Sequence, residues 1–159
     1  MKNHQFYLGA CFISAVMIMT VSCRQSEAPL ETKTEPVELP FTSSSAEATA
    51  AFKQGMDLLD VGNTQQARVQ FTKAIELDAT NPVYFDNRAL SRTEKEDYNG
   101  AIEDYSSSIE LYPTDPETFY QRGLVKLTMN NKYDACLDFK TAEELGSTEA
   151  KAAIKKNCK

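Results

Sequence analysis

Residues 98–111 read YNGAIEDYSSSIEL and predict an amphipathic helix. The apolar side chains of Tyr98, Ala101, Tyr105 and Ile109 are spaced three or four residues apart, so they share one face of a helix. The small Ala101 permits a close approach of a second helix backbone, and the large Tyr105 fills the space beside it. This stretch therefore predicts one half of a tightly packed helix pair.

The pattern recurs along the chain at intervals of 34 residues. The repeating columns are Gly55, Ala89, Gly123; Ala67, Ala101, Ala135; Phe71, Tyr105, Phe139; Ala74, Ser108, Ala142; and Leu77, Leu111, Leu145. Pro82 and Pro116 suit the first position of a helix, after the possible caps Asn81 and Asp115. Fixed self-similarity of this length indicates an array of stacked repeats.

The phasing of small and aromatic residues resembles the tetratricopeptide repeat (TPR). The resemblance implies an all-α fold, a solenoid of three helical hairpins in repeats 48–81, 82–115 and 116–149, within a domain spanning 46–159. Gly146 is a natural helix stop and Ser147 a helix cap, so we expect residues 147–157 to form a C-terminal capping helix.

Charged residues within the repeats predict contacts between the two helices of a hairpin. Arginine and aspartate recur 16 residues apart, as Arg88 with Asp104 and Arg122 with Asp138, whereas the first repeat has Gln54 with Gln70. Since a charged pair is exchanged for an uncharged pair as a unit, we infer that the two positions touch. The alternative is that these arginines bind a partner.

The N-terminal residues resemble a lipoprotein signal. Phe6 to Val21 carry no charge and follow Lys2, which is typical of a secretory signal peptide over 1–22; a retained membrane helix is the alternative. Thr20 to Cys23 resemble a bacterial lipobox. Leu8 to Cys11 also match the lipobox pattern, but they lie too early in the chain to follow an apolar core. The resemblance implies that Cys23 receives lipid and becomes the new N-terminus. The alternative is a soluble secreted chain with Cys23 free or paired.

Residues 23–45 are rich in Pro, Thr, Ser and Glu and predict a disordered tether between the lipid and the domain. Arg24 follows the lipidated cysteine instead of the aspartate that would suggest inner-membrane retention in some bacteria. We therefore expect a lipid-anchored protein of the cell envelope, in the outer membrane, on its periplasmic or surface face.

The composition disfavours several functions. The net charge of −6 disfavours nucleic acid as a partner. The only histidine, His4, lies in the expected signal peptide, so histidine-based triads and zinc sites are excluded from the mature chain. The glycines are scattered and build no phosphate-binding loop. We expect no enzyme activity, metal, cofactor or small-molecule substrate.

Two further cysteines lie in the repeat region. Cys136 falls on the second helix of the third repeat and Cys158 ends the expected capping helix. In an oxidising envelope they can form a disulfide, or they can remain two separate thiols with Cys136 as a small core residue. The sequence leaves both alternatives open.

The resemblance also implies a concave groove lined by the first helix of each repeat. The groove positions are Phe52, Met56, Asp86, Asn87, Leu90, Glu117, Tyr120, Gln121 and Leu124. Asn87 matches the clamp that some TPR domains use for a C-terminal carboxylate, but Phe52, Met56, Glu117 and Gln121 depart from it. The groove would suit an apolar or mildly basic protein segment, although Phe52 and Tyr120 could instead pack against the tether or a second copy.

These observations favour a lipid-anchored TPR adaptor that binds an unidentified protein or peptide in its groove. The alternative is a structural subunit of an outer-membrane assembly complex.

Overall fold

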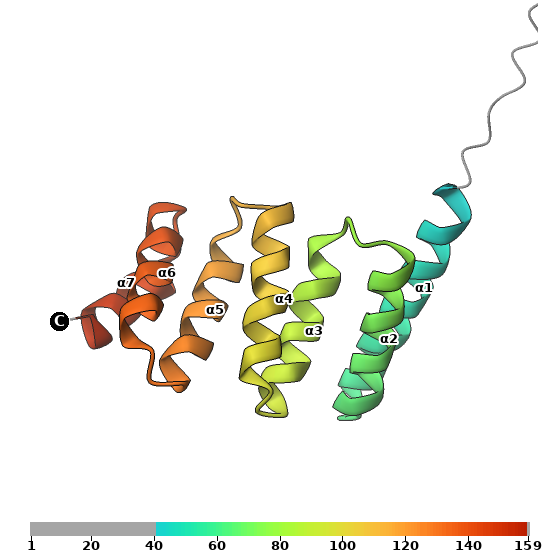
Figure 1. Ribbon diagram of the computed structural model, residues 1–159, viewed down its shortest axis with the longest axis horizontal. Helices are drawn as coiled ribbons and strands as arrows, with labels where there is room; N and C mark the ends of the chain where they lie inside the picture. The colour runs from blue at the N-terminus through green and yellow to red at the C-terminus, as the bar shows by residue number, and fades with distance from the viewer. Residues whose placement is uncertain (1–40, 159) are drawn as a thin grey trace, which may run out of the picture. The chain divides into compact units, whose positions relative to one another are not determined.

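The computed structural model describes residues 41–158, with the side chains of residues 45–158. The expected signal peptide, Cys23 and most of the expected tether lie outside the described residues. The described helices are α1 Phe41–Asp60, α2 Thr64–Leu77, α3 Pro82–Glu94, α4 Tyr98–Leu111, α5 Pro116–Thr128, α6 Lys132–Glu144 and α7 Thr148–Asn157 (Figure 1).

The helices form a row of antiparallel hairpins (Figure 1). The hairpins are α1–α2, α3–α4 and α5–α6, and α2, α4 and α6 each also pack against the following helix. The seventh helix, α7, packs against α6 at the C-terminal end of the row. The predicted all-α solenoid of three hairpins with a capping helix is therefore confirmed.

The core of the first and third hairpins depends on an aromatic ring packed against a glycine, which has no side chain. Phe71 and Phe139 are completely buried. A Cβ atom added at Gly123 would lie 2.6 Å from Cε1 of Phe139, and an added Cβ at Gly55 would clash with the ring of Phe71. The recurring glycine is thus explained by close approach of the first helix to the aromatic ring of the second.

Side chains cap the start of each helix from α2 to α7. The caps are Asn63, Asn81, Asp97, Asp115, Asn131 and Ser147, and each accepts a hydrogen bond from a backbone N–H in the first turn. Pro82 and Pro116 occupy the first helical turn, where a missing N–H costs nothing. These caps give the 34-residue spacing a local cause, because they fix where each helix begins.

The turn inside each hairpin has its own repeating feature, which the sequence pattern did not reveal. Gly62, Glu96 and Asn130 are 34 residues apart and have φ angles of +76°, +60° and +62°. Glycine adopts this left-handed conformation freely, whereas glutamate does so at a cost.

The N-terminal boundary of the domain differs from the sequence prediction. The helix α1 begins at Phe41, so residues 41–45, which we assigned to the tether, are helical. No proline or glycine occurs among these five residues, and Pro40 immediately before them suits a helix start. Among the described residues, no helix has the length and apolar character needed to cross a bilayer.

Candidate binding surface

A surface hollow lies between α3 and α5, and we call it the α3/α5 hollow. Its volume is about 180 Å³. It is lined by Asp86, Asn87 and Leu90 of α3, Tyr105 of α4, Asp115, and Glu117, Thr118 and Gln121 of α5. Five of the nine predicted groove residues thus meet at one place. Sequence reasoning missed three lining residues. It assigned Tyr105 to the core and Asp115 to helix capping, and it did not consider Thr118.

The hollow exists because the second repeat has a small residue where the other repeats have an aromatic one. Phe52 and Tyr120 occupy equivalent positions and cover the rings of Phe71 and Phe139, with centroids 5.6 and 5.8 Å apart. The residue at this position in the second repeat is Asp86, whose shorter side chain fills less space beside the equivalent Tyr105, which is itself buried. Tyr105 consequently forms part of the wall of the hollow.

Three carboxylates line the α3/α5 hollow, and no Lys or Arg of the described residues forms a salt bridge with any of them. The Thr118 hydroxyl lies 3.2 Å from Oδ1 of Asp86 and 2.6 Å from Oδ2 of Asp115, so its single proton serves one of them at a time. Glu117 accepts a hydrogen bond of 2.6 Å from Nε2 of Gln121. The hollow therefore carries three carboxylates that no salt bridge among the described residues neutralises.

Burial raises the pKa of Asp86 above its ordinary value. Hydrogen bonds from Ser108 and Thr118 oppose the rise, and the nearby charges of Asp115 and Asp104 add to it. The pKa of Tyr105 is also raised, first by burial and then by the charge of Asp86. Both shifts have the direction expected for acidic groups in a partly buried, negatively charged environment.

Other buried carboxylates of the domain are compensated by cations. Asp104 accepts hydrogen bonds from Nε and Nη2 of Arg88, at 2.9 and 2.7 Å, and also pairs with Arg92 at 3.1 Å. Asp138 does the same with Arg122, at 3.0 and 2.8 Å, and with Lys126 at 2.7 Å. The predicted contacts between positions 16 residues apart are thus present in the second and third repeats.

The arginines also join neighbouring repeats. Nη1 of Arg88 donates to the Thr72 hydroxyl, and Nη1 of Arg122 donates to the Ser106 hydroxyl, at 3.3 and 3.0 Å. Each acceptor lies on the second helix of the preceding repeat. With all these partners inside the domain, the arginines have a structural role.

The first repeat lacks this network. Gln54 is exposed, and the buried Oε1 of Gln70 has no hydrogen-bond partner. The position that holds Arg92 or Lys126 in the later repeats holds Leu58 here. The exchange between repeats therefore involves three positions, and the Oε1 atom of Gln70 accepts no hydrogen bond from Gln54.

A second hollow, the α5/α7 hollow, has a volume of about 420 Å³. It is lined by Tyr120, Leu124 and Leu127 of α5 and by Glu149, Ala152, Ala153, Lys156 and Asn157 of α7. Tyr120 and Leu124 thus lie at a different place from the other predicted groove residues of α5.

The two predicted groove residues of α1 line neither hollow. Phe52 packs between Phe71 and Tyr84, with ring centroids 5.6 and 5.0 Å away. Its main contacts are therefore inside the domain. Met56 is partly exposed, with 36% of its surface accessible.

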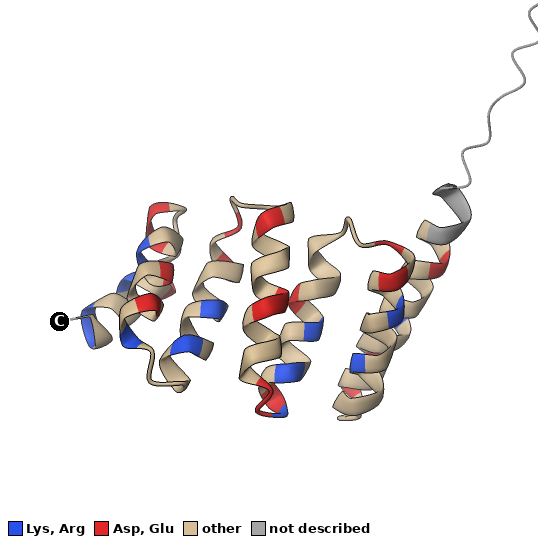
Figure 2. Cartoon of the chain, in the orientation of Figure 1, with Lys and Arg blue, Asp and Glu red and all other residues tan. Residues whose placement is uncertain are grey.

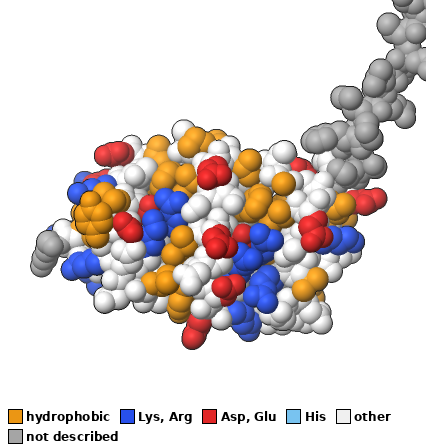
Figure 3. All heavy atoms as spheres, viewed as in Figure 1, with side chains coloured by type: hydrophobic (Ala, Val, Ile, Leu, Met, Phe, Trp, Pro, Cys, Tyr) orange, Lys and Arg blue, Asp and Glu red, His pale blue; other side chains and the backbone are white. Residues whose placement is uncertain are grey.

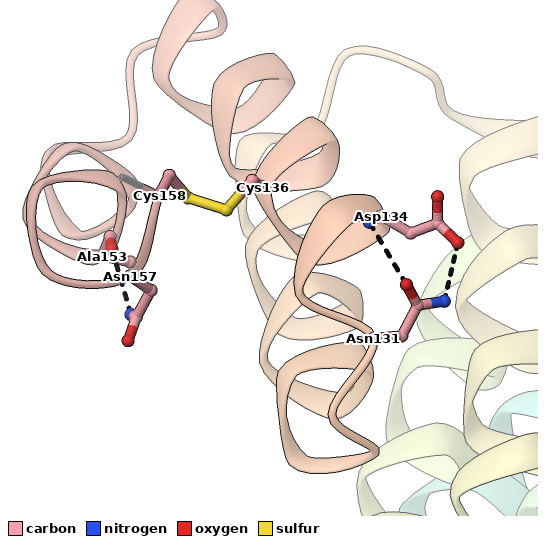
Figure 4. The surroundings of a disulfide bond; sticks show 6 residues. All are labelled: Asn131, Asp134, Cys136, Ala153, Asn157 and Cys158. Carbon is pink, nitrogen blue, oxygen red and sulfur yellow. Dashed lines mark hydrogen bonds between the residues drawn. A yellow bond between two sulfur atoms is a disulfide. The ribbon is translucent and has the colours of Figure 1, made fainter.

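A disulfide joins Cys136 of α6 to Cys158 at the end of α7 (Figure 4). Of the two alternatives that the sequence left open, the structure has the bond. Both cysteines are partly exposed and line a third hollow, of about 430 Å³, together with Lys132, Tyr133 and Lys140. The bond ties the capping helix to the last repeat.

Charges elsewhere are mixed. Lys and Arg on the one hand and Asp and Glu on the other are spread over the row of helices (Figure 2), and the face seen in Figure 3 shows basic, acidic and apolar side chains interspersed. The described residues contain no group of three or more His, Cys, Asp or Glu side chains suited to hold a metal ion.

Comparisons with known proteins identify the repeat. A family profile described as "TPR repeat" matches residues 89–130. The first TPR domain of Spaghetti (RPAP3), solved with the HSP90 peptide SRMEEVD, is 22% identical with a TM-score of 0.68, over 72% of this chain and 92% of that one. The Arabidopsis OM64 TPR domain has the same identity and TM-score over 71% and 95% of the two chains.

The N-terminal domain of stress-induced protein-1 from C. elegans is 19% identical with a TM-score of 0.68, over 74% of this chain and 98% of that chain. The described part of this chain therefore has the fold of a three-repeat TPR domain followed by a capping helix.

Proposed function

We propose that this domain binds a segment of a partner protein that inserts a lysine or arginine side chain into the α3/α5 hollow. The observation that carries the proposal is the set of three carboxylates, Asp86, Asp115 and Glu117, none of which has a salt-bridge partner in the described part of the chain. The exposed part of Leu90 and the wall formed by Tyr105 suit the methylene stem of such a side chain. The chemistry is that of recognition, since binding needs no reacting group.

The negative charge of the hollow predicts that this domain does not bind acidic peptides such as those solved with similar TPR domains. One domain of RPAP3 was solved with the HSP90 peptide SRMEEVD and another with the HSP70 peptide SGPTIEEVD. Both peptides end in Glu-Glu-Val-Asp, so three of their last four side chains are acidic. Such a segment would place like charges against Asp86 and Glu117, which disfavours binding. We therefore expect this domain to reject acidic tails.

Selection from a random peptide library tests the proposal. The mature chain is used to select peptides, and the parent is compared with the Asp86→Asn variant. We expect lysine or arginine to be enriched with the parent. The selected peptide should lose affinity at least tenfold with D86N, because a charge-assisted contact is removed.

The matched control is Asp57→Asn, which makes the same chemical change at an exposed carboxylate of α1. This variant should leave affinity unchanged. Enrichment of acidic residues, or equal loss with D57N and D86N, would refute a specific cationic subsite.

For the cellular setting, we propose a lipid-anchored adaptor of a bacterial envelope, held at the outer membrane through Cys23. The support is the apolar stretch Phe6 to Val21 and the lipobox-like residues before Cys23. A tether rich in proline and polar residues would give the domain reach toward its partner. Mass spectrometry of the mature chain tests this proposal: it predicts an acylated Cys23 at the N-terminus, and an unmodified Cys23 would contradict it.

A further inference from the structure

The helix α7 is short, and besides its disulfide it is held by two buried alanines and the partly buried Ile154. It has ten residues, and its buried side chains are the alanines Ala150 and Ala153. Helices of this length are marginal in water without tertiary support, and alanine contributes only one methyl group to a core. The bond between Cys136 and Cys158 is thus a major constraint on the position of α7.

The α5/α7 hollow requires α7 in its docked position. One wall of this hollow is the apolar surface of Tyr120, Leu124 and Leu127 on α5, and the other wall belongs entirely to α7. The same helix α5 supplies Glu117 and Gln121 to the α3/α5 hollow. A partner segment that lies along α5 can therefore reach both hollows.

The disulfide is accessible to a reductant. Cys136 and Cys158 are partly exposed at the surface hollow that also contains Lys132 and Lys140. The ammonium groups attract an incoming thiolate and favour the thiolate that leaves. The bond is therefore placed for exchange with a dithiol and is not sealed in the core.

We propose that the Cys136–Cys158 disulfide is a redox-controlled latch, which keeps α7 docked and so maintains the α5/α7 hollow as an apolar subsite for the partner segment. The functional step rests on the proposed binding function. An apolar side chain next to the lysine or arginine of the segment occupies this subsite. Reduction releases α7 and removes one wall of the subsite.

The reduction is a two-electron exchange with a dithiol. One thiolate of the dithiol attacks a sulfur of the Cys136–Cys158 bond and forms a mixed disulfide, and the other cysteine leaves as a thiolate. The second thiolate of the dithiol then breaks the mixed disulfide. The products are two cysteine thiols and one oxidised, cyclic dithiol, so atoms and electrons balance.

Hydrogen–deuterium exchange tests the latch directly. The full mature chain is compared oxidised and after treatment with dithiothreitol, and exchange of the α7 amides is measured against that of α3. We expect α7 exchange to accelerate on the order of a hundredfold, the effect of opening a loop of this length. Exchange in α3 should stay the same, because opening is local.

The Cys136→Ser/Cys158→Ser variant provides the control. Its α7 amides should exchange fast with and without dithiothreitol. Equal α7 exchange in the oxidised and reduced chains would overturn the latch, and so would acceleration of α3 by the same factor as α7, which would mark a global effect.

A binding measurement separates the latch from the proposed function. The probe is the lysine-containing peptide selected with the oxidised parent, and reduction should weaken its binding about tenfold. Full affinity of the reduced chain for this peptide would overturn the regulatory step and leave the proposed function standing. If no peptide binds either form, the proposed function fails and the regulatory step with it, while α7 exchange still decides whether the disulfide latches the helix.

Discussion

The network around Asp138 offers a quantitative test of how the repeats are held together. Only 6% of the Asp138 side chain is exposed, and it faces Arg122 and Lys126, whose side chains are 17% and 16% exposed. The Asp138→Gln change leaves two partly buried cations without their carboxylate. We expect a loss of about 3–5 kcal/mol in the free energy of unfolding, the range for breaking a buried ion pair from one side.

Replacing one partner of Asp138 should cost less stability than replacing Asp138 itself. After Arg122→Gln, Asp138 still has the ammonium group of Lys126 at 2.7 Å, so its charge stays compensated. The loss should be about 2 kcal/mol, smaller than for D138Q, because no buried charge is left without a partner. The structure thus predicts an order of effects that a simple isolated pair would not show.

A variant that removes all three charges together can be copied from the first repeat. Its equivalent positions hold Gln54, Leu58 and Gln70. The triple variant R122Q/K126L/D138Q transfers this set to the third repeat and removes every charge together. Since the triple variant leaves no buried charge without a partner, we expect it to lose less stability than D138Q, with a remaining cost of about 1–3 kcal/mol for a buried amide like that of Gln70.

Urea unfolding followed by circular dichroism at 222 nm measures all of these variants. The control is Arg68→Gln, which removes a long, partly exposed ion pair at 3.8 Å and should cost less than about 0.5 kcal/mol. A triple variant less stable than D138Q, or losses that add, would refute the view that the three residues act as one unit.

Three other changes test separate parts of the fold and the site. Gly123→Ala should lose about 1–2 kcal/mol, because the clash of its Cβ with the Phe139 ring exceeds the gain in helix propensity; thermal unfolding measures it. Glu96→Gly should gain about 1 kcal/mol by relieving the positive φ, and no gain in urea unfolding would contradict this account. Asp86→Asn should stabilise the domain at neutral pH, because a raised pKa means that ionised Asp86 is less favourable in the folded state than in the unfolded chain. This advantage should shrink as the pH falls through the raised folded pKa and disappear below the ordinary value of 3.8, so a gain that persists in acid would contradict it.

The repeats and most helix starts could be predicted from the sequence because they have local causes. The caps Asn81 and Asp115 and the prolines after them fix helix starts within a few residues, and the caps are present in the structure. The Arg122–Asp138 contact was predictable for a different reason, since the repeats provide an internal comparison in which paired positions change together.

The division of the groove into two hollows could not be predicted in the same way. The predicted groove places equivalent positions of the repeats in equivalent surroundings. The backbone repeats in this way, but the side chains around each position do not. Leu90 lines the α3/α5 hollow, whereas the equivalent Leu124 lines the α5/α7 hollow. Which hollow a residue faces depends on the volumes of its neighbours on the adjacent helices, and a single column of the repeat does not contain this information.

Asp86 shows how a repeat can turn a packing position into a recognition site. In the first and third repeats an aromatic residue here covers a buried ring, and the position contributes to stability. In the second repeat a carboxylate stands here without a cation, although Asp104 nearby is held by two arginines. If stability alone shaped the position, an aromatic residue would serve better, because Asp86 leaves a hollow and carries the cost of a raised pKa. We therefore expect D86N to make the domain more stable and to weaken its binding of the partner. A recognition role for Asp86 predicts this combination, whereas a structural role predicts a loss of stability.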